Sequence, residues 1–164
     1  MRTQVIRSVF PIVSGILWAV SGANAAEGEF SPPVWINPGI YSHHLDRSTH
    51  FRGNNVGLGA EVLIAPDHAV MAGSFINSES ARSRYGAYAW RPLHWQFGGI
   101  GVSAGVILGA FDGYPRYRNG AWFIAPMPVL AVEGKRLGVN LSLIPSLKNR
   151  VDGAIAIQVK LRVW

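Results

Sequence analysis

Between residue 26 and the C-terminus, eight successive runs of about ten residues alternate apolar side chains with small or polar ones. Alternation of this kind predicts β-strands with one apolar and one polar face. No run in this part approaches the roughly 18 apolar residues that a membrane-spanning helix needs. The predicted strands are residues 39–46, 54–64, 69–78, 85–93, 99–111, 122–133, 137–145 and 153–164.

The connections between these runs alternate between short and long. Residues 65–68, 94–98 and 134–136 are short, whereas residues 47–53, 79–84, 112–121 and 146–152 are longer, polar and rich in Arg and Gly. Bacterial outer-membrane barrels have short turns on the periplasmic side and long loops outside. The sequence therefore predicts an all-β protein, an eight-stranded antiparallel up-and-down transmembrane β-barrel over residues 39–164. A soluble β-sandwich or lipocalin-like barrel is the alternative, because alternation alone does not exclude it.

The first residues have the pattern of a secretory signal peptide. A basic start precedes an apolar region at residues 9–20, and small residues at 23–25 form a cleavage pattern. The apolar region is too short to span a bilayer, although an uncleaved anchor is the alternative. We therefore predict a signal peptide at residues 1–25, a proline-rich periplasmic segment at residues 26–38, and export through the periplasm to the outer membrane.

Charge and cysteine content narrow the possible partners. The chain holds 15 Lys and Arg, of which two lie in the predicted leader, against 9 Asp and Glu. A basic balance favours anionic lipid or a phosphorylated glycan, and export argues against nucleic acid. The absence of cysteine excludes disulfides, thiol catalysis and thiolate metal sites. Since a closed barrel has no free strand edges, we expect a monomer.

The final strand shows the alternation most clearly. Every second residue from Ile155 to Val163 is a large apolar residue, and the residues between them include Lys160 and Arg162. The apolar set is expected to face lipid and the other set the barrel interior. Buried cations need counter-charges, which Glu61 and Glu133 in other strands can supply.

The predicted outer rim brings a histidine and a serine to the same end of the barrel. Alternation places Ser42, His44 and Asp46 on the inward face of the first strand, and Ser78 ends the third. A histidine near a hydroxyl offers a general base and an alcohol, the pairing used in acyl transfer. A hydrogen-bonded structural histidine is the alternative. A metal site at His43 and His44 is disfavoured, because adjacent strand residues point to opposite faces.

Two further features lie at or near the predicted outer rim of the barrel. The longer connections carry many cations, which suggest contact with phosphorylated glycolipid, and passive lipid binding explains them equally well. These cations are Arg47, Arg52, Arg82, Arg84, Arg116, Arg118, Lys148 and Arg150. Pro126, Pro128 and Pro145 lie in or beside neighbouring predicted strands, where a missing N–H group interrupts the ladder. They predict either a gap through which an acyl chain reaches the interior, or only a bulge.

Several short motifs in the second half of the chain resemble those of one family. They are Trp-Arg-Pro-Leu at residues 90–93, Gly-Val-Ser-Ala-Gly-Val at 101–106, Pro-Met-Pro-Val-Leu at 126–130 and Ile-Pro at 144–145. In order and spacing these resemble the outer-membrane lipid A palmitoyltransferases of the PagP family, and residues 44 and 75–78 extend the likeness into the first half. The resemblance implies an eight-stranded barrel with lateral lipid access at its prolines. It also implies transfer of an acyl chain from phospholipid to lipid A.

The resemblance also implies a set of site residues. The family uses a His, an Asp and a Ser, which match His44, Asn77 and Ser78, so an amide replaces the carboxylate. Asn77 is expected to orient the imidazole, with Asp46, Glu79 or Asp112 as other sources of negative charge. Arg82, Arg84, Arg116 and Arg118 are expected to hold the phosphorylated sugar.

The chemistry that these residues imply needs no metal or organic cofactor. The family's amphipathic N-terminal helix is not expected here, since residues 26–38 contain three prolines. The alternatives are a non-catalytic lipopolysaccharide-binding barrel, or an outer-membrane lipid A deacylase or phospholipase.

Overall fold

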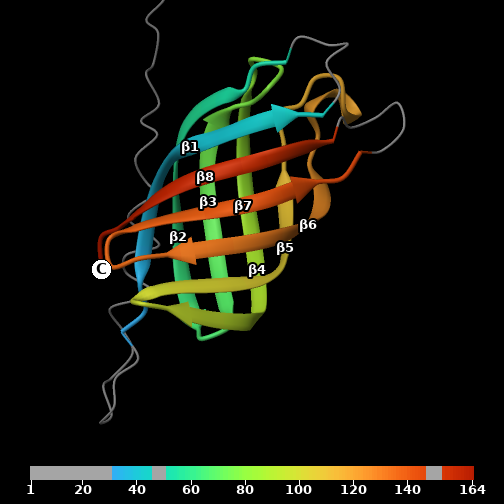
Figure 1. The fold of residues 1–164 in the computed structure, drawn as a ribbon. Coiled ribbons are helices and arrows are strands. Elements are labelled where there is room, and N and C mark those ends of the chain that lie inside the picture. Colours follow the sequence, from blue (N-terminus) through green and yellow to red (C-terminus); the bar gives the residue numbers. More distant parts are fainter. Residues whose placement is uncertain (1–30, 46–50, 147–152) are drawn as a thin grey trace, which may run out of the picture. The chain divides into compact units, whose positions relative to one another are not determined.

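The computed structural model describes residues 31–45, 51–146 and 153–164, which form a closed barrel (Figure 1). The predicted signal peptide and Asp46, Arg47, Lys148 and Arg150 lie outside the described residues. The eight strands are β1 (Val34–His44), β2 (Asn54–Ala65), β3 (His68–Ile76), β4 (Arg82–Phe97), β5 (Ile100–Phe111), β6 (Phe123–Glu133), β7 (Leu137–Ile144) and β8 (Ala154–Arg162). Among the described residues, one 3-10 turn, η1 (Arg118–Gly120), lies between β5 and β6.

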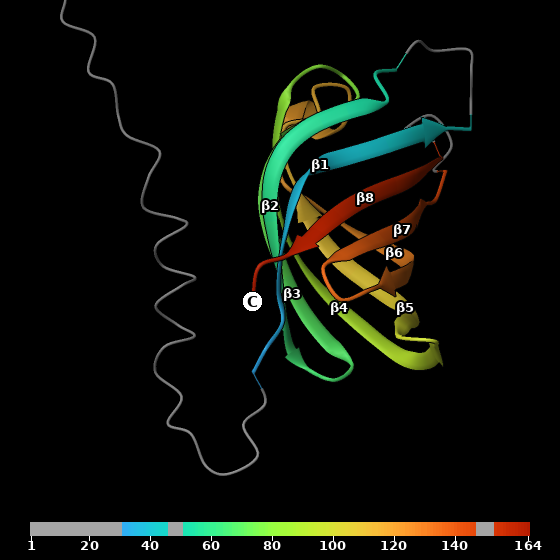
Figure 2. The same ribbon diagram turned by 60° about the vertical axis from the view of Figure 1, so that its left-hand side comes forward.

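Each strand pairs antiparallel with the next in the sequence, and β1 pairs with β8 to close the barrel. The predicted all-β, eight-stranded, up-and-down barrel is therefore confirmed. No helix among the described residues is long and apolar enough to cross a membrane. The β3–β4 and β5–β6 connections lie at the top of the barrel in Figure 2, and the β2–β3 turn lies at its bottom. We call these the loop end and the turn end.

Two strands extend well beyond their predicted bounds. β1 begins at Val34 rather than at residue 39, because the strand accommodates Pro38 at a bulge where Gly39 has a φ of 131°. β4 continues to Phe97, so the predicted connection at residues 94–98 is mostly strand. Gly98 and Gly99 alone make that turn, both with positive φ, as tight hairpins require.

Side chains alternate between the inside and the outside of the barrel as predicted for β8. Ile155, Val159 and Leu161 are exposed on the outer face, whereas Gln158 and Lys160 are buried inside. Arg162 lies exposed at the turn end rather than inside, because the strand ends there.

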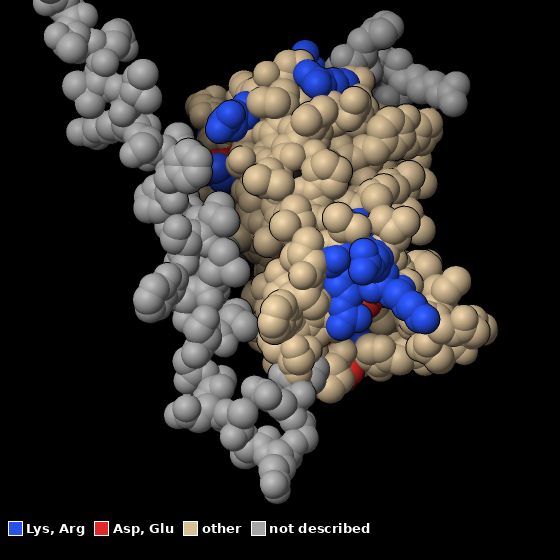
Figure 3. Space-filling model, turned by 90° about the vertical axis from the view of Figure 1, so that its left-hand side faces the viewer, with Lys and Arg blue, Asp and Glu red and all other residues tan. Residues whose placement is uncertain are grey.

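All eight strands present at least one large apolar side chain to the outside. Figure 3 shows one face, where uncharged residues cover most of the surface and Lys and Arg gather in separate places. The buried polar residues include Asn37, Ser42, Asn55, Glu61, Arg91, Ser103, Asn140, Gln158 and Lys160. The barrel thus carries large apolar side chains on its outer face, and its interior combines apolar side chains with buried polar and charged ones.

Candidate acyl-binding site

A cavity of about 490 Å³ occupies the loop end of the barrel interior. Most of its lining is apolar, and it includes Ile40, Met71, Phe75, Ala87, Ile107, Phe111, Phe123, Met127 and Ile144. Polar side chains join it from the strand ends and the connections, among them Ser42, His44, Asn55, Ser78, Glu79 and Arg116. A largely apolar space with polar groups at its mouth suits an apolar ligand with a polar head.

His44 occupies the last position of β1 and lines this cavity, as predicted from the alternation. Its ring stacks on Phe51, with ring centroids 4.7 Å apart, and the guanidinium of Arg116 lies 5.6 Å from the centre of the Phe51 ring. Nε2 of His44 lies 3.4 Å from the hydroxyl oxygen of Ser42. The imidazole is therefore held between an aromatic ring and a hydroxyl at the edge of the cavity.

Ser42 is buried, and its hydroxyl oxygen accepts a hydrogen bond of 2.7 Å from Nδ2 of Asn55. Asn55 begins the inward face of β2, where it is also buried. The alternation in β1 already placed Ser42 beside His44. Asn55 and Phe51 were not predicted, because they come from the neighbouring strand and its connection, and only the register of β1 against β2 brings them there.

Ser78 lines the same cavity, so the structure brings it and His44 to one space as predicted. Its carbonyl oxygen accepts a hydrogen bond from the backbone N–H of Arg52, which joins the β3–β4 and β1–β2 connections. The hydroxyl oxygen in contact with the imidazole is nevertheless that of Ser42.

Asn77 has a different role from the one predicted. Its Nδ2 donates to the hydroxyl of Ser83 and the carbonyl of Gly113, and its Oδ1 accepts from the N–H groups of Glu79 and Ala81. These four bonds use the full capacity of the amide, and the side chain is fully buried. Asn77 therefore stabilises the β3–β4 connection and has no donor or acceptor left to orient His44.

The four predicted sugar-binding arginines differ in their relation to the cavity. Arg116 alone among them lines the cavity. Arg84 pairs with Asp112 at 2.5 Å, so Asp112 is not a counter-charge for His44, and the Arg84 side chain is 64% exposed. Arg82 and Arg118 are exposed and do not line the cavity.

The connection that carries Arg116 also encloses the cavity. The backbone N–H of Arg116 donates to Oε2 of Glu79 at 2.9 Å. Tyr114 and Tyr117 from the same connection also line the cavity. Burial, and then the nearby Glu79 carboxylate, raise the pKa of Tyr114 well above its ordinary value. Tyr114 therefore stays protonated at neutral pH.

The prolines coincide with an interruption in the barrel wall. β6 pairs with β5 along its whole length, but with β7 only from Val129 to Glu133. Pro128 faces outward and comes directly before Val129, the residue at which pairing of β6 with β7 begins. Pro126 on β6 and Pro145 after β7 both line the cavity. The ladder between β6 and β7 therefore stops beside the cavity, where a residue without an N–H group cannot continue it. We call this interruption the β6–β7 opening.

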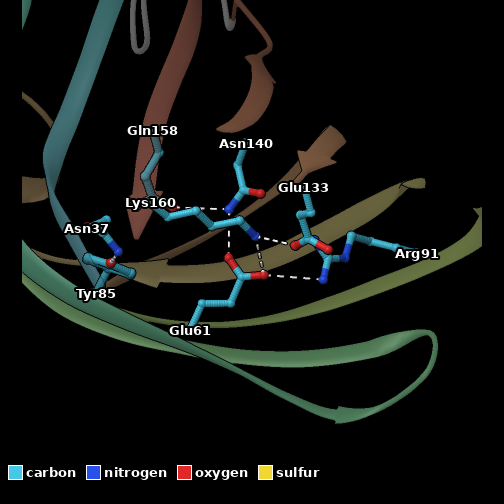
Figure 4. A network of polar contacts seen from close by, with 8 residues as sticks. All are labelled: Asn37, Glu61, Tyr85, Arg91, Glu133, Asn140, Gln158 and Lys160. Atoms are coloured by element: carbon cyan, nitrogen blue, oxygen red, sulfur yellow. Dashed lines mark hydrogen bonds and ion pairs between the residues drawn. The ribbon is translucent and has the colours of Figure 1, made fainter. Parts of the chain in front are cut away.

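A network of charged and amide side chains lies below the cavity (Figure 4). Nζ of Lys160 lies 2.7 Å from Glu61 and 2.5 Å from Glu133, which confirms the predicted counter-charges. Arg91 contacts both carboxylates at 3.2 Å. Asn140 donates to Glu61 and to Gln158. Two cations thus balance two carboxylates in the interior, so the network is neutral overall.

This network also closes the lower end of the cavity. Asn140 and Gln158 contribute to the cavity lining. Arg91 and Glu133 line a second cavity of about 340 Å³ toward the turn end. The network therefore separates two spaces in the barrel interior.

No family model matches this chain, and no curated protein sequence matches it significantly. In the part of the chain that the structure describes, no three His, Cys, Asp or Glu side chains gather closely enough to hold a metal ion. The chemistry of the site therefore has to be inferred from its own side chains.

Proposed function

We propose that this protein is an outer-membrane acyltransferase that moves a fatty acyl chain from a phospholipid to lipid A. The observation that carries the proposal is an apolar cavity inside a barrel whose outer surface is also apolar. An apolar exterior suits contact with lipid chains. A closed barrel is also one of the two folds that can satisfy backbone polar groups within a bilayer. An apolar interior space suits an acyl chain, since water gains nothing from entering it.

A path for the chain supports acyl transfer over passive lipid binding. The β6–β7 opening borders the cavity on one side and the outer surface on the other. A phospholipid in the outer leaflet could slide one acyl chain through this opening while its headgroup stays in the interface. The ester bond would then lie near the loop end, close to His44 and Ser78.

The side chains at that end match the needs of ester chemistry. His44 acts as the general base, and Ser78 on the cavity wall donates a hydrogen bond to the reacting ester. Arg116 binds a phosphate of the lipid with its planar guanidinium. Asn77 acts through the β3–β4 connection that presents Ser78 and Glu79, and not on the imidazole.

Mass spectrometry of lipid A from cells with and without the gene tests this proposal. A transferase adds one acyl chain to lipid A. A deacylase removes a chain, a phospholipase leaves lipid A unchanged while lysophospholipid accumulates, and a passive lipopolysaccharide-binding barrel changes neither. Only the gain of a chain, lost in the His44→Ala variant, supports acyl transfer.

A further inference from the structure

Two inward residues of β1 place a hydroxyl beside an imidazole. The Ser42 oxygen lies 3.4 Å from Nε2 of His44, and Asn55 donates to that same oxygen at 2.7 Å. Because the amide occupies one lone pair of the oxygen, the serine hydrogen remains available to donate to Nε2. This arrangement corresponds to the imidazole tautomer with its proton on Nδ1.

The Ser42 hydroxyl and the Asn55 amide both lie inside the barrel rather than in the connections between strands. Ser42 is 6% exposed and Asn55 is 4% exposed, yet both line the cavity. A nucleophile needs a base within hydrogen-bond reach and a third group that orients the base, and distances are often longer before substrate binds. Ser42 and His44 supply the first two on β1, Phe51 stacks on the imidazole, and Asn55 on β2 holds the hydroxyl in place.

We propose that Ser42 is the nucleophile of the acyl transfer and carries the chain as a covalent ester between donor and acceptor. This inference rests on the proposed function, and it assigns a role to a residue other than Ser78. Asn55 is a positioning residue, because it acts on the hydroxyl and not on the reacting carbonyl. Ser78 keeps its role as a hydrogen-bond donor to the developing oxyanion.

The reaction proceeds in two balanced halves. Ser42 Oγ attacks the ester carbonyl carbon while its proton passes to Nε2 of His44. The bond to the glycerol oxygen then breaks, and that oxygen takes the proton and leaves as lysophospholipid. In the second half, a hydroxyl of lipid A attacks the acyl-serine ester and gives its proton to His44. Ser42 Oγ leaves and recovers that proton, so the enzyme returns to its starting state.

The acyl chain of this intermediate would extend into the apolar part of the cavity. Ile40 lies two residues before Ser42 on the same face of β1, and Met71 and Phe75 line the same space from β3. Burial of the chain among these side chains would hold the ester in place while the donor headgroup leaves and the acceptor binds. Exclusion of water would also slow hydrolysis of the ester.

A long-chain alkyl phosphonate ester, which modifies activated serines irreversibly, tests this assignment. The full-length protein is reconstituted in phospholipid vesicles with the probe, digested and sequenced by mass spectrometry. We expect the probe on Ser42, and we expect the His44→Ala variant to lose labelling by about 10²–10⁴-fold. The Ser78→Ala variant should be labelled more slowly, because the oxyanion donor is lost, but still on Ser42.

Ser103→Ala is the matched control, because Ser103 is a buried inward serine beside the second cavity and should not affect labelling. Circular dichroism confirms that each variant folds. A probe found on Ser78, or no probe on Ser42 of the folded wild-type protein, overturns the assignment.

Failure of this assignment differs from failure of the proposed function. If lipid A gains a chain and Ser42 stays unlabelled, the transfer occurs directly from donor to acceptor and Ser42 is not its nucleophile. If Ser42 is labelled and lipid A gains nothing while lysophospholipid accumulates, Ser42 is the nucleophile of a lipid hydrolase. The second result leaves the serine assignment intact and removes the transferase.

Discussion

The two halves of the barrel interior differ in what fills them. Toward the turn end, which we call the filled half, Lys160, Arg91 and two glutamates form a network of paired charges beside a second cavity of about 340 Å³. Toward the loop end, which we call the hollow half, lies the apolar cavity of about 490 Å³, with His44 at its edge. A cavity of this kind costs stability, since its walls lack packing partners. The comparison suggests that one half holds the barrel together and the other binds a ligand.

The largest effect is expected from removal of the base in the hollow half. His44→Ala should lower acyl transfer by about 10²–10⁴-fold, because general base catalysis contributes that much. The measurement is the initial rate of lipid A acylation in vesicles. His43→Ala is the matched control, since His43 lies next to it on β1 but is exposed on the other face. Equal losses in both variants would show that the effect is not catalytic.

In the filled half, removal of a cation should destabilise the barrel instead. Lys160→Met leaves Glu61 with less positive charge in a buried site, and breaking a buried pair costs about 3–5 kcal/mol. Equilibrium unfolding by urea in detergent micelles measures this loss. Lys135→Met is the control, because Lys135 is exposed in the β6–β7 connection. An unchanged stability of Lys160→Met would mean that the network contributes little to folding.

Closing the β6–β7 opening should slow transfer without unfolding the barrel. The chain contains no cysteine, so Pro126→Cys combined with Pro145→Cys can be bridged selectively by a reducible bifunctional thiol reagent. We expect about a tenfold loss of transfer, corresponding to about 1.4 kcal/mol, and recovery after reduction. The unbridged double variant serves as its own control. Full activity with the bridge in place would exclude this route for the acyl chain.

The smallest expected effects are those of replacing two arginines at the loop end, Arg116 and Arg84, which should change different properties of the protein. Arg116→Ala removes a cation that lines the cavity and should raise the KM for lipid A several-fold with kcat little changed. Arg84→Ala removes an exposed partner of Asp112 and should cost only about 0–1 kcal/mol of stability. Steady-state kinetics and thermal unfolding distinguish them. A raised KM in Arg84→Ala would extend the lipid-binding surface beyond the cavity.

The filled half was largely predictable from the sequence, and the hollow half was not. A period of two in β8 placed Lys160 inside, and a buried cation requires carboxylates, which left few candidates besides Glu61 and Glu133. The partners of Ser42 depend on the register of β1 against β2, which is shifted at Pro38 by a bulge. The hydrogen bonds of Asn77 depend on Ser83 and Gly113, which the fold brings to it from β4 and the β5–β6 connection.

The most direct test of the role of the hollow half follows one acyl chain. Purified protein is placed in vesicles that contain lipid A and a phospholipid with a deuterated acyl chain, and both products are analysed by mass spectrometry. Acyl transfer predicts lipid A carrying the deuterated chain, together with an equal amount of lysophospholipid. Unmodified lipid A, after incubation with protein whose folding has been verified, would contradict it.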